Sequence, residues 1–132
     1  MEKPDYKLQE KLGLKPDQIT FILNSPNNYE KKLPQAIPLS NANEINQNFD
    51  WLQVFYTNRS QLTKEIDQIK RKMSRHGQLW ISWPKKSSKI KLDLSDDIVR
   101  DVGLSVGLVD VKIAAIDETW SGLKFVYRVK DR

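Results

Sequence analysis

Cysteine is absent from the 132-residue sequence, and His76 is its single histidine. Without cysteine the chain cannot form a disulfide, a thiolate nucleophile or a cysteine-ligated zinc site. One histidine without a second soft ligand supports neither a zinc centre nor a histidine-based catalytic triad. A glycine-rich phosphate-binding loop is also missing. We therefore predict no metal site, no cofactor and no catalytic residue of these classes.

Long apolar runs are missing as well. The chain begins with the charged hexapeptide MEKPDY, which does not resemble a signal peptide. No stretch approaches the ~18 apolar residues that a membrane span requires. The expectation is a cytoplasmic protein with no membrane partner. Its length predicts a single domain, residues 1–132.

Positive charge is concentrated in one segment of the sequence. The net charge is +5, but residues 59–91 hold ten Lys and Arg residues against only Glu65 and Asp67, a net +8. The rest of the chain consequently carries −3. Such asymmetry is typical of a protein with an anionic partner and also of a solvated helix face.

Short apolar segments alternate with helical patterns, as in βαβ units. The near-continuous apolar run at 18–24 is typical of a strand buried on both faces. Pro38 lacks an amide donor, which places 36–39 at a sheet edge. Strands are predicted at 18–24, 36–39, 49–57, 78–83, 109–117 and 122–129. The short link 118–121 predicts an antiparallel pairing of the last two.

The clearest helix is predicted at 59–76. Its apolar stripe consists of Leu62, Ile66, Ile69 and Met73. Asn58 is the expected N-cap, Gly77 the expected stop, and His76 the last helical residue. Other helices are predicted at 5–13, 27–33 and 96–103 or 96–107. The acids at 96–97 fit a helix N-terminus better than a catalytic carboxylate pair.

This element order predicts an α/β three-layer sandwich, Rossmann-like, in which a mostly parallel sheet ends in an antiparallel C-terminal strand pair. The order resembles the later two-thirds of the S-adenosylmethionine-dependent methyltransferase fold, where one reversed strand is inserted between its neighbours. The sequence GQLWIS at 77–82 is similar to a helix-to-strand junction of those enzymes. The resemblance implies a fold, and a fold does not fix a function.

The chain is also similar to a family of small bacterial proteins described only as a domain of unknown function. The similar stretches are LWISWPKK at 79–86, GLVDVK at 107–112, DETWSGLK at 117–124 and LGLKP at 12–16. This resemblance implies the same methyltransferase-like fold and a bacterial cytosolic setting. It implies no activity.

The methyltransferase resemblance implies cofactor-binding residues that this sequence lacks. A glycine-rich turn is expected after the first strand, and an acid at the end of the second. The sequence has NSPNN at 24–28 and LSN at 39–41 instead, with Glu44 the nearest acid. After the central strand it has YTNR at 56–59, which is not a substrate amide motif. We therefore predict a degenerate fold that does not use S-adenosylmethionine.

Ligands of open α/β sheets bind beyond the carboxyl ends of the parallel strands. The residues at those ends form the predicted rim: Asn24, Ser25, Asn58, Arg59, Trp83, Lys85, Lys86, Asp117, Glu118 and Trp120. The last three join this rim only if the preceding strand runs parallel to the others. Tryptophan stacks on flat groups and lysine attracts anions, so a small anionic or planar ligand is expected.

Six of these rim residues also have a structural interpretation. The two tryptophans can simply pack at the sheet margin, and the two lysines can lie in a solvated loop. Asp117 and Glu118 can pair with Lys112 or Lys124 across the hairpin.

The leading functional hypothesis is a non-catalytic module that binds a small ligand or a protein partner. One alternative is a nucleic-acid-binding protein that uses the basic 59–91 segment, with contacts from Lys64, Lys70, Arg71, Lys72 and Arg75. Another is an enzyme in which Lys85, Lys86, Asp117 or Glu118 acts as acid or base.

Overall fold

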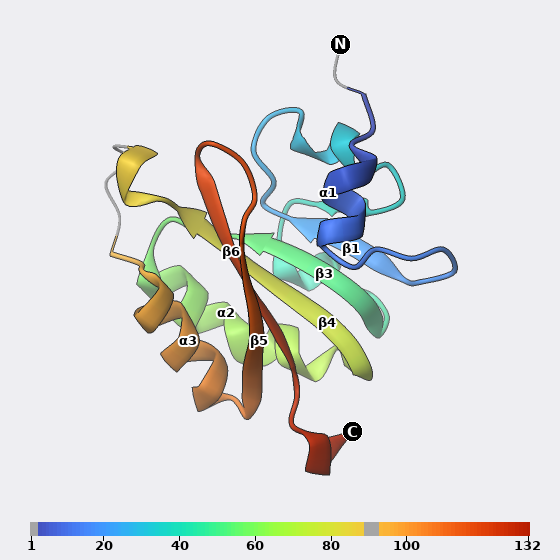
Figure 1. Ribbon diagram of the computed structural model, residues 1–132. Coiled ribbons are helices and arrows are strands. Elements are labelled where there is room, and N and C mark those ends of the chain that lie inside the picture. Colours follow the sequence, from blue (N-terminus) through green and yellow to red (C-terminus); the bar gives the residue numbers. More distant parts are fainter. Residues whose placement is uncertain (1–2, 89–92) are drawn as a thin grey trace.

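The computed structural model describes residues 3–88 and 93–132, which contain a six-stranded sheet in the order β2-β1-β3-β4-β6-β5 (Figure 1). The strands are β1 (Thr20–Leu23), β2 (Ile37–Leu39), β3 (Phe49–Phe55), β4 (Met73–Pro84), β5 (Leu108–Ala115) and β6 (Trp120–Tyr127). β2, β1, β3 and β4 are parallel, whereas β6 runs antiparallel to both β4 and β5. The predicted fold class is confirmed, including the reversed strand between its two neighbours.

Helices pack on both faces of this sheet (Figure 1). The α-helices are α1 (Tyr6–Lys11), α2 (Arg59–Arg71) and α3 (Asp96–Ser105). Short 3₁₀ turns lie at η1 (Tyr29–Lys32), η2 (Ala42–Glu44), η3 (Lys86–Ser88) and η4 (Val129–Asp131). α2 and α3 cover one face, and α1 with η1 covers part of the other. None of the helices in the described residues is long and apolar enough to cross a membrane.

Two apolar clusters hold these layers together. On the α2 and α3 side, alternate residues of β3, β4 and β6 meet the buried stripes of the two helices. On the α1 side, Leu8 and Leu12 pack against Trp51 and Trp80, the two largest fully buried side chains. Both indole N–H groups donate to the Leu12 carbonyl, at 2.7 and 2.9 Å. These bonds fix the end of α1 over β3 and β4.

The predicted helix 59–76 is too long. α2 stops at Arg71 with Lys72 as its C-cap, and the Lys72 carbonyl accepts a bond from the Phe49 amide of β3. Met73, placed on the helical stripe by its spacing, is instead the first residue of β4 and packs in the same core cluster. Sequence periodicity cannot separate these two placements, because both bury the side chain at that position.

Consequently, His76 and Gly77 lie in β4 and do not end a helix. The register between β3 and β4 shifts here, from Phe49 opposite Met73 to Trp51 opposite Gln78. A Cβ atom at Gly77 would lie 2.9 Å from the Ser74 carbonyl oxygen and 3.1 Å from that of Phe49. The glycine is thus required by a close backbone approach within the strand.

The predicted hairpin link, residues 118–121, lies two residues later than the observed turn. Ile116 to Thr119 form the turn, whereas Trp120 and Ser121 begin β6. The Asp117 carboxylate accepts bonds from the amides of Thr119 and Trp120, both at 2.8 Å, which fixes the turn. α3 ends at Ser105, and the left-handed residue that follows it is Gly107, with φ +90°. Gly103 lies inside the helix.

Candidate ligand site at the carboxyl ends of β1 and β2

An open hollow of about 770 Å³ lies where β1 and β2 end. It is lined by residues 24–28, Glu30 and residues 38–40. The lining consists mainly of amide and hydroxyl groups. Glu30 is the one ionisable side chain among the described residues that line it. This position, beyond the carboxyl ends of neighbouring parallel strands, is where open α/β sheets bind ligands.

Two asparagines shape the loop after β1. Asn24 and Asn28 adopt left-handed conformations, with φ 61° and 67°. Asparagine is the residue besides glycine that enters this region most readily. The Asn24 amide donates to the Leu39 carbonyl at 3.2 Å, and its side chain donates to the Phe55 carbonyl at 3.3 Å. Asn24 therefore joins the ends of β1, β2 and β3.

The loop after β2 is closed by Glu44, the acid nearest to this strand end in the sequence. Its carboxylate accepts bonds from the amides of Ser40 and Asn41, at 2.8 and 2.9 Å. Together with the Asn41 side chain it forms a capping box on η2. Glu44 thus stabilises its own loop, and the acid at the hollow is Glu30.

A row of aromatic rings runs from the loop after β1 to the β5–β6 turn. The Tyr29 ring packs edge-on to Phe55 with ring centres 4.8 Å apart, and Phe55 packs edge-on to Trp120 at 5.0 Å. The Tyr29 hydroxyl donates to Gln53 at 2.7 Å, and Gln53 donates to the Ser82 hydroxyl at 3.0 Å. Burial raises the pKa of the Tyr29 phenol, which stays a donor.

Because β5 runs parallel to β4, its carboxyl end reaches the same rim. A smaller hollow of about 190 Å³ is lined jointly by residues 26–29, Lys32, Asp117, Thr119 and Trp120. Glu118 lies next to it and faces a further open hollow with Lys32. The structure therefore brings the loop after β1 together with the 117–120 segment. Asp117 is engaged by its own turn, and the described ion pairs do not include either acid.

Trp83, Lys85 and Lys86 lie apart from the main hollow. The Trp83 side chain is 5 % exposed and belongs to the core on the α2 and α3 side. The Lys85 ammonium donates to the Asp117 carbonyl at 2.5 Å, and the Lys85 amide donates to the Thr119 carbonyl at 2.8 Å. Lys85 therefore ties β4 to the β5–β6 turn. Lys86 is exposed in η3, and Trp83, Lys85 and Lys86 together line a hollow of about 250 Å³ near the start of α3.

Asn58 and Arg59 serve the start of α2. The Asn58 side chain accepts a bond from the Gln61 amide at 2.8 Å, as its predicted N-cap role requires. The Arg59 amide donates to Asp93 at 2.7 Å, and its side chain is exposed. Neither residue lines the hollow after β1 and β2.

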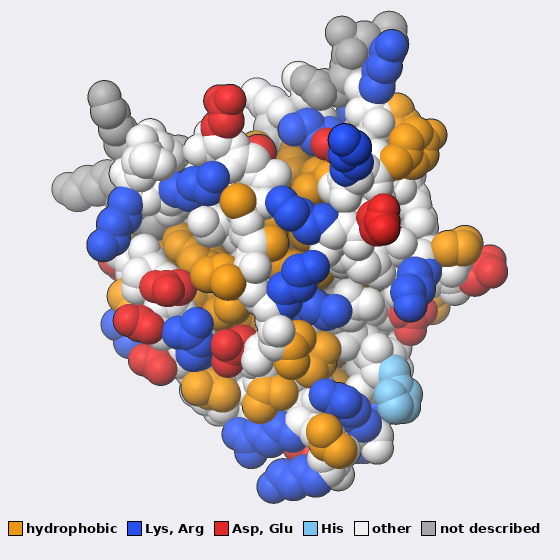
Figure 2. Space-filling model, viewed as in Figure 1, with side chains coloured by type: hydrophobic (Ala, Val, Ile, Leu, Met, Phe, Trp, Pro, Cys, Tyr) orange, Lys and Arg blue, Asp and Glu red, His pale blue; other side chains and the backbone are white. Residues whose placement is uncertain are grey.

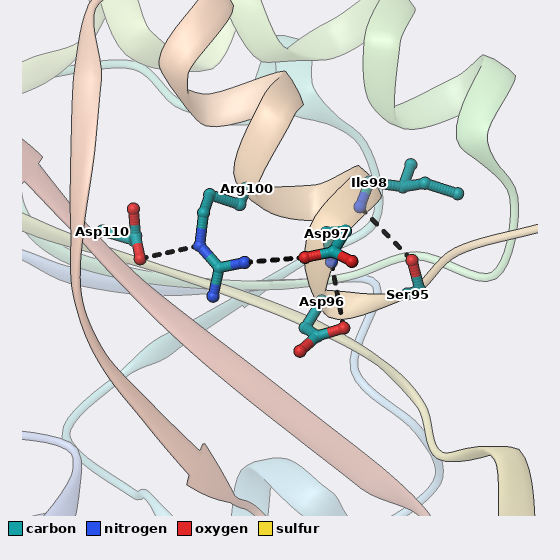
Figure 3. Close-up of polar contacts among 6 residues, drawn as sticks. All are labelled: Ser95, Asp96, Asp97, Ile98, Arg100 and Asp110. Atoms are coloured by element: carbon teal, nitrogen blue, oxygen red, sulfur yellow. Dashed lines mark hydrogen bonds and ion pairs between the residues drawn. The ribbon is translucent and has the colours of Figure 1, made fainter.

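The Asp96 and Asp97 pair is also structural (Figure 3). Ser95 caps α3 by accepting the Ile98 amide at 3.3 Å, and the two acids follow in the first turn. Arg100 pairs with Asp97 at 3.1 Å and with Asp110 of β5 at 3.0 Å. The hydrogen bond to Asp110 raises the pKa of the Arg100 guanidinium. In the described residues no cluster of three acids or histidines is arranged to hold a metal ion.

The described cations of the basic segment 59–91 are spread over α2 and both ends of β4. Arg71 is paired with Asp67 on α2, and the Lys70 ammonium lies 5.2 Å from the Tyr127 ring centre. Arg75 lies near the start of β4, whereas Lys85 follows its end, roughly 30 Å away along an extended strand. Lys89 and Lys91 lie outside the described residues.

Sequence reasoning missed seven residues that line the main hollow: Pro26, Asn27, Asn28, Glu30, Pro38, Leu39 and Ser40. Ser40 could have been predicted, because it directly follows the second predicted strand and so lies at a strand end. Glu30 lies in a turn with no strand-end signal, and only the folded chain shows that it faces the same hollow.

No protein-family model matches this sequence, and no curated protein sequence matches it. Solved structures do match its fold. Magnesium protoporphyrin IX methyltransferase from Synechocystis PCC 6803 superposes with a TM-score of 0.55 at 11% identity, covering 70% of this chain and 46% of that one. LepI, in a complex with S-adenosylmethionine, superposes with a TM-score of 0.57 at 11% identity, covering 93% of this chain and 39% of LepI. A putative methyltransferase from Thermoplasma acidophilum superposes with a TM-score of 0.50 at 9% identity, covering 83% of this chain and 57% of that one.

These likenesses establish a methyltransferase-like, Rossmann-like fold. The identities are too low to carry an activity or a ligand from those proteins to this one. The chain also spans only about two-fifths to three-fifths of the length of those chains.

Proposed function

We propose that this protein is a non-catalytic binding module on a degenerate methyltransferase-like fold, and that it holds a small polar ligand in the hollow after β1 and β2. The observation that carries the proposal is the hollow itself, about 770 Å³ in volume, at the carboxyl ends of adjacent parallel strands. Ligands of open α/β sheets occupy this position.

The lining suggests the chemistry of the ligand. Amides of residues 24, 27 and 28 and the hydroxyls of Ser25 and Ser40 offer both donors and acceptors. Glu30 offers only acceptors when ionised, and no Lys or Arg is among the described lining residues. A ligand rich in hydroxyl or amine groups fits this set better than the anionic one expected from the sequence. A planar ring stays compatible with it.

Two features support binding without catalysis. Glu30 is alone as a titratable group in the lining, so a general acid and a general base are not paired there. The loop after β1 carries asparagine where the methyltransferase resemblance implies glycine, and an asparagine side chain fills space that glycine leaves for a cofactor. A cytoplasmic location stays a prediction from the sequence.

Native mass spectrometry of the freshly purified protein tests the proposal first, by detecting a co-purified small molecule. Thermal shifts with a matched pair of probes, adenosine and adenosine monophosphate, then test the charge of the ligand. A ligand present at 100 times its Kd stabilises the protein by ~2.7 kcal/mol. We expect the neutral probe to give the larger shift.

Asn27→Ala and Glu30→Gln should weaken binding of that probe at least tenfold. Asn46→Ala and Glu10→Gln change the same residue types at exposed positions away from the hollow and should have no effect. The proposal fails if the purified protein carries no small molecule and neither probe shifts it. A sub-micromolar Kd for S-adenosylmethionine in calorimetry would also contradict it.

A further inference from the structure

Among the described residues, no helix packs over the β5 and β6 half of the sheet on its α1-side face. Figure 1 shows α1 standing over β1 and β3, with β5 and β6 in front and uncovered among the elements drawn. Val111 of β5 is 53 % exposed on this half, and Lys112 is exposed too. Gly122, Lys124 and Val126 of β6 alternate with the buried Leu123 and Phe125, so they point to this same face.

Lysines gather on this face from distant parts of the chain. Lys112 of β5 is directly opposite Lys124 of β6, and like charges in that position destabilise a sheet. Burial and the charges of Lys112 and Lys15 together lower the pKa of Lys124. The Lys112 ammonium also donates to the Lys11 carbonyl at 3.1 Å. This bond brings the end of α1 next to these lysines. The fold therefore concentrates positive charge here against its own stability.

A cationic hollow of about 290 Å³ continues this surface toward the start of β4. Its lining includes Arg75, His76, Lys124 and Arg132, with Val111 and Val126. Arg75 donates to the Asp131 carbonyl and Arg132 donates to the Tyr127 carbonyl, so neither bond neutralises a charge. Neither Asp nor Glu is among the described lining residues.

Acidic side chains are found elsewhere. The ion pairs in the described residues lie on α2, within α3, or between α3 and β5. Figure 2 shows Lys and Arg side chains along the middle and lower part of this face, with many of the acidic ones toward its margins. We call the surface formed by Lys15, Arg75, Val111, Lys112, Lys124 and Val126 the basic sheet face.

We propose that the basic sheet face binds the phosphate backbone of a single-stranded nucleic acid without reading its sequence. A patch of Lys and Arg on one face of a chain with a pI near 9.4 is the electrostatic signature of nucleic-acid binding. The cations of β5 and β6 lie on two adjacent strands, a width of roughly 5 Å between strand axes. That narrow row suits one phosphate strand better than the two backbones of a duplex.

This surface differs from the basic 59–91 segment that the sequence suggested, and only Arg75 is common to the two. It is also separate from the hollow after β1 and β2. The inference therefore stands or fails independently of the proposed function.

Fluorescence anisotropy with a labelled 20-nucleotide poly(dT) at several salt concentrations tests the inference. For a single strand the slope of log K against log salt is about −0.7 per neutralised phosphate, so three to four contacts give roughly −2 to −3. The double variant Lys112→Gln/Lys124→Gln should bind at least tenfold more weakly and should make the slope less negative by about 1.4.

The matched control is Lys64→Gln/Lys72→Gln, which removes two exposed charges at α2. It should bind like the unaltered protein. An equal loss in this control would show that net charge or α2 carries the binding and would overturn the assignment. Absence of binding at about 50 mM salt, tighter binding of a duplex of the same length, or equal affinity for poly-glutamate would each overturn it as well.

A second readout separates binding from folding. Removing one or both of two facing lysines relieves repulsion, so Lys112→Gln/Lys124→Gln should keep or raise the urea midpoint of the unaltered protein. A clearly lower midpoint would mean that the lysines serve the fold, and the proposal would lose its basis.

Discussion

At the scale of single residues, the backbone around the hollow depends on side chains that tolerate left-handed geometry. Asn24 and Asn28 both have positive φ, and they bracket the loop that follows β1. Asn28 is exposed, and its side chain makes no capping bond to η1. Its contribution to stability should therefore come from backbone conformation alone.

Replacing Asn28 by alanine should lower the free energy of unfolding by about 1 kcal/mol, because a left-handed conformation costs an alanine more than it costs an asparagine. Asn28→Gly should change it by only a few tenths, since glycine has no Cβ atom to clash. Urea denaturation of the two variants measures the difference. Equal losses in both would mean that the side chain, not its φ angle, matters.

At the scale of elements, the close approach of α3 to β6 fixes the carboxyl half. Gly103 was one of two candidates for the residue that ends α3, and the structure places it within the helix, against the buried ring of Phe125. A Cβ atom there would lie 2.0 Å from a ring carbon of Phe125. The glycine allows the helix to reach the sheet.

Gly103→Ala should therefore destabilise the protein by up to about 2 kcal/mol. The overpacking cost of roughly 1–3 kcal/mol exceeds the gain in helix propensity of about 1 kcal/mol. Asp101→Ala, on the exposed side of the same helix, is the matched control and should stay within about 0.5 kcal/mol of the parent. Thermal and urea unfolding measure the change in the free energy of unfolding. A Gly103→Ala variant more stable than the parent would contradict the close contact with Phe125.

At the scale of the whole molecule, one buried tyrosine lies in each of the two core clusters. Tyr29 belongs to the cluster under α1, and Tyr56 to the cluster under α2, where its hydroxyl donates to Glu65 at 2.5 Å. Burial is the main cause that raises the pKa of both phenols above the ordinary value near 10. Both layers of the fold thus favour neutral tyrosine.

Because the folded pKa values exceed the unfolded ones, the stabilising effect of these tyrosines is complete below about pH 10 and is lost as the pH rises above it. Urea midpoints measured from pH 8 to about 11.5 should fall steeply at the alkaline end. A Tyr29→Phe/Tyr56→Phe variant, less stable at pH 8 because it lacks two hydrogen bonds, should show a shallower decline. An equally steep decline would assign the effect to other groups.

Much of the fold could be read from local pattern. The apolar run at 18–24, the proline at 38 and the short final link correctly predicted a buried strand, an edge strand and an antiparallel pair. The end of α2 could not be read in this way, because Met73 is apolar and points to the core whether it is helical or extended. Its pairing with Phe49, which is distant in sequence, decides its conformation.

The candidate site was predictable only in outline. Strand ends located the rim, and Asn24 and Ser25 do line the hollow. Side-chain type suggested Trp83 and Lys85 as ligand contacts, and both line a separate hollow near the start of α3, although Trp83 is mostly buried and Lys85 bonds the Asp117 carbonyl. Burial and hydrogen-bond partners depend on what packs nearby, and the order of residues alone does not contain that information.

The sequence by itself determined the α/β class, the element order and the absence of cysteine chemistry, because periodicity and residue type act locally. The tertiary structure alone decided which residues share a surface. Glu30 reaches the hollow beside Ser40, and Lys15, Lys112 and Lys124 meet across nearly the whole length of the chain. Sheet pairing between distant segments makes those neighbours, and the long-range contacts behind it leave no local pattern in the sequence.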